Sequence, residues 1–135
     1  MRYQHRLKVL QEGAVWLRQE LACIGLELRE EQLQELYHTQ QLALRRYEWV
    51  ETKEDCLFDI LMPFVKSPAM ALQTYMVQFK QVIWLYYHVR SHLDWHVSDE
   101  ELCEILYEEY LHHHGEINRQ LANRILRRQH TRKEE

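Results

Sequence analysis

Apolar residues recur along almost the whole chain at the helical period of 3.6 residues. They fall three or four positions apart within each segment, and no segment alternates between apolar and polar residues as a half-buried strand would. The pattern predicts helices over residues 3–23, 30–49, 54–65, 68–93, 99–112 and 116–129. We therefore expect an all-α fold, a compact bundle of five to six helices around a central apolar helix at about 68–93.

Local signals mark several of these helix ends. Gly25 is expected to terminate the first helix, because glycine readily adopts the left-handed conformation found after helix C-termini. Ser67 followed by Pro68 is typical of a helix start, with serine as the N-cap and proline in the first turn. Ser98 with Glu101 has the spacing of a capping box and predicts that a helix opens at residue 99.

The predicted helix over residues 68–93 is apolar on two opposite sides. One stripe comprises Leu72, Tyr75, Met76, Phe79, Val82, Ile83 and Tyr86. The opposite stripe comprises Met70, Val77 and Trp84, spaced by seven, with Leu85 and Val89 nearby. A helix of this kind either lies at the centre of a bundle or presents one side to another chain. In the second case, the partner-binding residues are Met70, Val77, Trp84, Leu85 and His88, with Trp84 as the hot spot.

Length and composition favour one domain without enzymatic machinery. The 135 residues predict a single helical domain over residues 1–129 and a charged, frayed tail over residues 130–135. The three glycines leave almost no material for a phosphate-cradling loop, and neither a G-x-S-x-G nor an H-E-x-x-H motif occurs. We therefore expect a non-enzymatic protein, and the sequence indicates no cofactor and no small-molecule substrate.

Cysteine usage and hydropathy point to the cytoplasm. Cys23, Cys56 and Cys103 are widely separated, which is typical of reduced thiols rather than of a disulfide framework. The most apolar stretch, residues 82–87, is far shorter than a membrane span. The expected location is cytoplasmic, with no membrane partner.

Two histidines in the fourth predicted helix suggest an alternative function. His88 and His92 are four residues apart and would share a helix face, where two imidazoles could hold one zinc or nickel ion. The simpler interpretation is that they are solvent-exposed or packed against aromatic rings, because no surrounding carboxylates are specified.

Charge is distributed unevenly along a chain of net charge −4. Residues 98–111 contain six acidic side chains, and residues 116–135 contain six basic ones, so the two segments are expected to be neighbours or solvated faces. Glu109 falls near the apolar stripe of its helix and is expected to approach the core. A second alternative function is nucleic-acid binding through the last predicted helix, with Arg119, Arg124, Arg127 and Arg128. The acidic overall charge argues against it.

A series of motifs resembles a known family. They are Gly25-Leu26-Glu27-Leu28, Glu30-Glu31, Val50-Glu51, Ser67-Pro68, Tyr75, Tyr86-Tyr87, Arg90 and Ser98-Asp99-Glu100-Glu101-Leu102. The order is similar to that in a family of short bacterial proteins, found mainly in anaerobic Gram-positive species and described only as a domain of unknown function. The resemblance covers about residues 20–125 and implies a cytoplasmic bacterial protein with no known enzyme activity. Trp49 stands where the family has arginine, and the glycine-rich stretch that follows there is missing here.

The sequence as a whole predicts a non-enzymatic helical protein-interaction module, either a homodimer or an accessory subunit, whose biological role it does not name. Metal binding through His88 and His92, and nucleic-acid binding through the last helix, are the alternatives.

Overall fold

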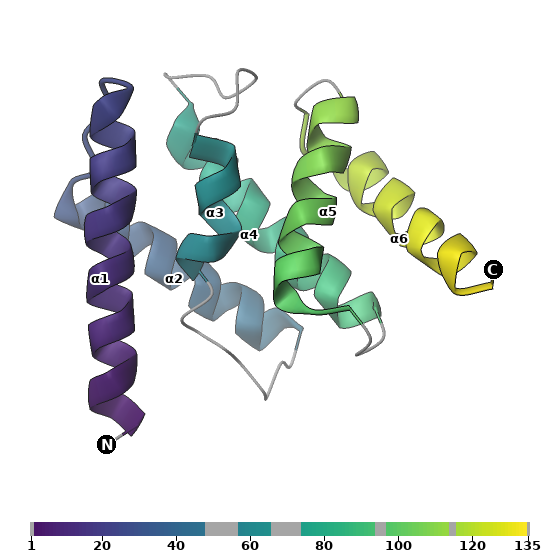
Figure 1. Cartoon of the computed structure of the whole chain (residues 1–135), viewed down its shortest axis with the longest axis horizontal. Helices are drawn as coiled ribbons and strands as arrows, with labels where there is room; N and C mark the ends of the chain where they lie inside the picture. Colours follow the sequence, from purple (N-terminus) through teal and green to yellow (C-terminus); the bar gives the residue numbers. More distant parts are fainter. Residues whose placement is uncertain (1, 48–56, 66–73, 94–96, 114–115, 135) are drawn as a thin grey trace.

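A computed structural model of the chain describes residues 2–47, 57–65, 74–93, 97–113 and 116–134, and within these ranges it contains helices and no strand (Figure 1). The helices are α1 (Arg2–Cys23), α2 (Glu30–Arg46), α3 (Leu57–Val65), α4 (Tyr75–His92), α5 (Asp99–His112) and α6 (Arg119–Glu134). The expected all-α bundle is confirmed. In Figure 1, α1 and α6 lie at opposite ends of the bundle, and α3 and α5 lie in front of α4.

Helix α4 forms the centre of this arrangement. It packs against α2, α3, α5 and α6. Its buried residues cover more than half of the circumference of the helix and are Tyr75, Phe79, Val82, Ile83, Leu85, Tyr86, Tyr87, Val89 and Arg90. A helix so extensively apolar is stable in water only when other helices cover most of its surface.

The helix ends that the sequence marks most clearly are confirmed. After α1, Gly25 has a φ of +81°, the Leu26 N–H donates to the Leu21 carbonyl at 2.9 Å, and the Gly25 N–H donates to the Ala22 carbonyl at 3.1 Å. These two bonds form a Schellman motif. At the start of α5, the Ser98 hydroxyl oxygen accepts a hydrogen bond from the Glu101 N–H at 3.1 Å.

The predicted starts of two helices are wrong. Helix α4 begins at Tyr75 instead of residue 68, because Thr74 has a φ of −123° and a ψ of +18°, outside the helical region. The predicted cap at Ser67-Pro68 lies outside the described residues. Helix α6 begins at Arg119 instead of residue 116 and continues to Glu134. Its start is set by Asn118, whose side-chain oxygen accepts from the Leu121 N–H at 3.0 Å as an N-cap.

A part-buried polar network fixes the connection between α4 and α5. The Tyr86 hydroxyl donates to the Asp99 carboxylate at 2.6 Å. Arg90, only 8% exposed, donates to the Val97 carbonyl and lies 3.6 Å from the same carboxylate. Because a buried guanidinium is costly without partners, these bonds hold Val97 and Asp99 against the last turns of α4.

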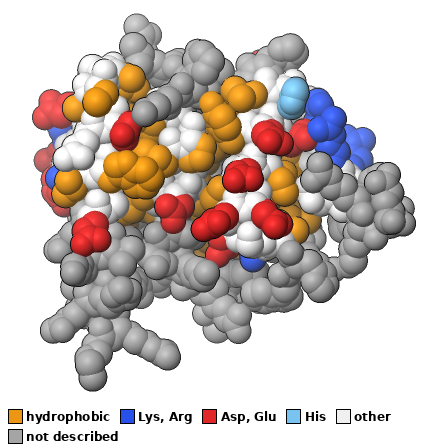
Figure 2. Space-filling model, viewed as in Figure 1, with side chains coloured by type: hydrophobic (Ala, Val, Ile, Leu, Met, Phe, Trp, Pro, Cys, Tyr) orange, Lys and Arg blue, Asp and Glu red, His pale blue; other side chains and the backbone are white. Residues whose placement is uncertain are grey.

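The acidic and basic segments are neighbours, as their charges suggested. Glu109 of α5 is 6% exposed, and its carboxylate pairs with Arg124 Nε at 3.1 Å and with the Arg128 guanidinium, both from α6. Four other acidic side chains of α5 are exposed, and Figure 2 shows acidic groups gathered over this helix. The exposed ones are Glu100, Glu101, Glu104 and Glu108.

Removing the buried charge should weaken the α5–α6 contact. We expect Glu109→Gln to lower the free energy of unfolding by about 1–2 kcal/mol, less than for a fully buried pair because both arginines still reach solvent. Urea denaturation measures this change. The matched control is Glu108→Gln, an exposed neighbour that should change stability by less than about 0.5 kcal/mol. Equal effects of the two substitutions would contradict a structural role for Glu109.

Gly13 allows α1 and α3 to approach closely. A Cβ atom added at this position would lie 2.3 Å from Cδ2 of Phe58, a ring that is 3% exposed. The ring therefore occupies the space that any larger residue at position 13 would need.

Gly13→Ala should therefore destabilise the protein. Overpacking against Phe58 should cost about 1–3 kcal/mol, which exceeds or cancels the gain of about 1 kcal/mol that alanine brings to a helix interior. Thermal or urea denaturation measures the net effect. Combining Gly13→Ala with Phe58→Leu should recover part of the overpacking loss in a double-mutant cycle. A net stabilisation near 1 kcal/mol by Gly13→Ala alone would show that the contact is not tight.

Candidate functional site

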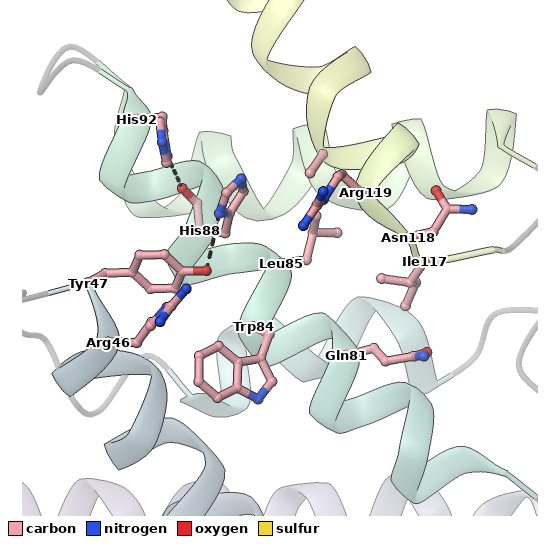
Figure 3. A pocket seen from close by; sticks show the side chains of 11 residues that line it. Arg46, Tyr47, Gln81, Trp84, Leu85, His88, His92, Ile117, Asn118 and Arg119 are labelled. Carbon is pink, nitrogen blue, oxygen red and sulfur yellow. Dashed lines mark hydrogen bonds between the residues drawn. The ribbon is translucent and has the colours of Figure 1, made fainter.

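A pocket of about 540 Å³ opens where the end of α2, the face of α4 and the start of α6 meet (Figure 3). Three separate segments supply its lining. These residues are Arg46 and Tyr47 from α2 and its C-cap, then Gln81, Trp84, Leu85, His88 and His92 from α4, and Ile117, Asn118, Arg119 and Ala122 from α6 and the turn before it. The volume is within the range of small-molecule sites, about 300–1,000 Å³.

Aromatic rings form one wall of the pocket. Tyr47 packs edge-to-face against Trp84, with ring centroids 6.2 Å apart, and against His88, with centroids 5.6 Å apart. Both geometries are favourable for aromatic pairs. Tyr47 thus holds the two α4 rings in fixed positions, and Leu85, which is 5% exposed, supports the wall from the core side.

The two histidines are held by hydrogen bonds through their Nδ1 atoms. The Tyr47 hydroxyl and His88 Nδ1 share a hydrogen bond of 3.1 Å. His92 Nδ1 lies 2.8 Å from the His88 carbonyl, which can only accept, so this nitrogen carries the proton. The imidazole rings are 4.7 Å apart. The Nε2 atom of each histidine is therefore the ring nitrogen left for any other partner.

The charged groups among the described lining residues of the pocket are basic. Arg46 and Arg119 are exposed and line the cavity, and no aspartate or glutamate of the described ranges does. Across the described ranges, neither guanidinium forms an ion pair. In Figure 3 the two arginines reach toward the α4 face from opposite sides. The electrostatic potential of the pocket is therefore positive.

His88 is held in its neutral form by this environment. Burial lowers the pKa of its imidazole below the ordinary value of 6.5, and the neighbouring His92 and Arg119 lower it further. Because the unfolded chain binds a proton at His88 more readily than the folded chain does, this residue reduces stability as the pH falls below about 6.5. Above that pH the contribution is absent.

The residues predicted to bind a partner do not share one environment. Val77 is 56% exposed, Trp84 and His88 are half-buried, and Leu85 is buried in the core, so it lies beneath the surface. Met70 lies outside the described residues. Trp84, Leu85 and His88 come together at the pocket, and Val77 lies two helical turns before Trp84 on α4.

The residues of the two alternative functions are placed as follows. His88 and His92 are adjacent, but the described residues contain no group of three side chains able to hold a metal ion, and Arg46 and Arg119 oppose a cation there. Among the four arginines considered for nucleic acid, Arg124 and Arg128 contact Glu109. Arg119 lines the pocket, and Arg127 is exposed.

Sequence reasoning missed half of the pocket. Arg46, Tyr47 and Arg119 come from helices far from α4 in the sequence, and the position of each depends on tertiary packing. A partial signal existed, because Arg46 and Tyr47 end α2 and Arg119 starts α6, and helix ends are common places for binding residues.

The fold and pocket describe a small all-helical protein with a mixed basic and aromatic cavity. The chain belongs to the family of unknown function DUF6323, whose family model matches residues 15–133. No curated protein and no solved structure gives a significant match. Within the described ranges, every helix is too short or too polar to cross a membrane.

Titration of the histidine rings tests the electrostatic description of the pocket. By NMR, the His88 imidazole should titrate below pH 6.5. In Arg119→Gln, the pKa should rise because one nearby positive charge is removed, but it should stay below 6.5 because burial is the largest cause. An unchanged pKa in this variant would show that Arg119 does not act on His88.

Proposed function

We propose that this protein is a non-enzymatic helical protein-interaction module, acting as a homodimer or as an accessory subunit. The observation that carries the proposal is the exposure of α4. Although this helix is the centre of the core, Val77 remains 56% exposed, and Trp84 is only half-buried. Large apolar side chains that remain accessible on one face are typical of interaction surfaces.

Trp84 is the expected anchor of this surface. Tryptophan is enriched among residues whose truncation costs most binding energy. Its ring is already positioned by the edge-to-face contact with Tyr47, so little side-chain freedom is lost on binding. Val77 and His88 flank it on the same helix, Leu85 supports it from below, and Met70 would extend the surface toward the preceding segment.

A second copy of the chain is the partner that this spacing favours. Val77 and Trp84 are seven residues apart, so an antiparallel pairing of two α4 helices about a two-fold axis places each Val77 against the Trp84 of the other copy. The same contact is then made twice. Two-fold dimers of this kind are the commonest oligomers of soluble proteins.

The proposed setting is the cytoplasm of a bacterium. Supporting this, the free thiols of Cys23, which is exposed, and of Cys103, which is buried, are compatible with a reducing compartment. The bacterial origin rests on the resemblance described above.

Solution mass tests the proposed self-association. Light scattering over a concentration series should show a dimer for the native chain and a shift toward monomer for Trp84→Ala, with unchanged helicity by circular dichroism. The matched control is Trp16→Ala, because Trp16 on α1 is 45% exposed and lies outside the proposed surface; it should leave the mass unchanged.

Three outcomes would contradict the proposal in different ways. A monomer at every concentration would rule out self-association. Unfolding of Trp84→Ala would place Trp84 in the core rather than at an interface, and Val77→Ser, an exposed position on the same stripe, would then be the variant that tests the surface. Equal loss of dimer in Trp84→Ala and Trp16→Ala would place the contact elsewhere.

A further inference from the structure

The pocket has a chemical character that self-association does not require. It lies beside the proposed α4 surface and shares only Trp84, Leu85 and His88 with it. We propose that this pocket binds a small organic anion, in which a carboxylate or phosphate group is attached to a flat apolar body. The inference goes beyond the proposed function and does not depend on it.

The first argument is the unbalanced positive charge. Arg46 and Arg119 both line the pocket. Among the residues that the structure describes, no acidic side chain lines it and neither arginine has an ionic partner. The contrast with Glu109 is informative, because there the fold pairs one buried carboxylate with two arginines of α6. At the pocket, the corresponding anion is not supplied by the lining residues.

The geometry of these cations suits an oxyanion. A guanidinium donates two parallel N–H bonds to a carboxylate or a phosphate. Arg119 is also the first residue of α6, so the positive end of the helix dipole adds to its charge at this place. The Asn118 side-chain oxygen accepts a hydrogen bond from the Leu121 N–H, and the described lining residues that carry a permanent positive charge are the two arginines.

The second argument is the apolar part of the lining. Trp84 and Tyr47 form an aromatic wall, and Leu85, Ile117 and Ala122 supply aliphatic surface. A flat ring can pack on such a wall, whereas inorganic phosphate or acetate alone would leave it in contact with water. The volume of about 540 Å³ accommodates a ring system together with its anionic group.

The third argument is the state of the histidines. His88 is neutral at pH 7 because burial, His92 and Arg119 lower its pKa, and its Nδ1 is bonded to the Tyr47 hydroxyl. An anion bound beside it would favour the charged imidazole, so protonation and anion binding should reinforce each other. The titratable and charged groups facing His88 in the pocket are His92, Tyr47, Arg46 and Arg119. No carboxylate in the lining would offset the effect.

Isothermal titration calorimetry with three matched probes tests the proposal. The probes are 2-naphthoate, 2-naphthyl phosphate and the neutral 2-naphthamide. Both anions should bind about tenfold or more tightly than the amide, because they alone form ion pairs with the arginines. The anion that binds with the higher affinity shows whether the pocket prefers a carboxylate or a phosphate group.

Variants of the native chain locate the binding. Arg46→Gln combined with Arg119→Gln should weaken binding of the anionic probes about tenfold or more and leave the amide unaffected. Arg45→Gln is the matched control, because Arg45 is an exposed arginine of α2 that does not line the pocket. Lowering the pH from 7.5 to 5.5 should tighten binding of 2-naphthoate, which stays ionised over this range, since His88 then gains its proton more readily, and His88→Gln should remove most of this pH dependence.

Several results would overturn the proposal. Equal affinity for the anions and the amide would show that the pocket recognises only a ring. Equal weakening by Arg45→Gln and by the double variant would show a general charge effect. Because Trp84, Leu85 and His88 belong to both the pocket and the proposed dimer surface, the titrations are repeated on Val77→Ser, a position outside the pocket whose change disrupts the proposed dimer. Binding that is absent from both proteins, for every probe at millimolar concentration, rejects the pocket, whereas binding to Val77→Ser alone supports it and shows that the dimer covers it.

Discussion

The structure depends on the burial of one helix. Helix α4 carries apolar side chains around most of its circumference, so other helices must cover it before it is stable in water. The contacts with α2, α3, α5 and α6 meet this requirement. The same requirement determines where function can be located, because the part of α4 that remains accessible is the stripe containing Val77, Trp84 and His88. The pocket and the proposed interaction surface both lie along that stripe.

Polar contacts then determine how the covering helices are oriented. Arg90, Tyr86 and Asp99 fix the turn between α4 and α5, and Glu109 holds α6 against α5 through two arginines. Burial of apolar area alone would accept several orientations of α6. In the observed orientation, the ion pairs of Glu109 join α5 to α6, and the first turn of α6 reaches the α4 face, where Arg119 lines the pocket.

Much of the fold could be predicted from sequence because its signals are local. The helical period is present in each segment, and Gly25 and Ser98 act through bonds within one helical turn. The errors came from competition between local signals. Helix α6 was expected to begin at residue 116, but Asn118 acts as its N-cap. The apolar pattern of the fourth predicted helix is continuous from residue 68, but the backbone of Thr74 is not helical.

The site was harder to predict than the fold. His88 and His92 stood out as a pair, but their spacing alone suggested a metal. The neighbours that change this interpretation, Arg46, Tyr47 and Arg119, come from the ends of two other helices. Only tertiary packing brings them to His88. Leu85 was expected on the partner-binding surface because it follows Trp84 directly, but it is buried in the core.

The residues that give the chain its family resemblance lie mainly in the scaffold. Tyr86, Arg90 and Asp99 belong to the network at the α4–α5 turn, and Gly25 ends α1, whereas Arg46, Trp84 and Arg119 of the pocket are not among the motifs. Architecture and recognition are thus encoded at different positions. Replacing Arg46 or Arg119 therefore removes none of the hydrogen bonds that cap α1 and α5, and the proposed ligand site can be altered in this chain separately from those caps.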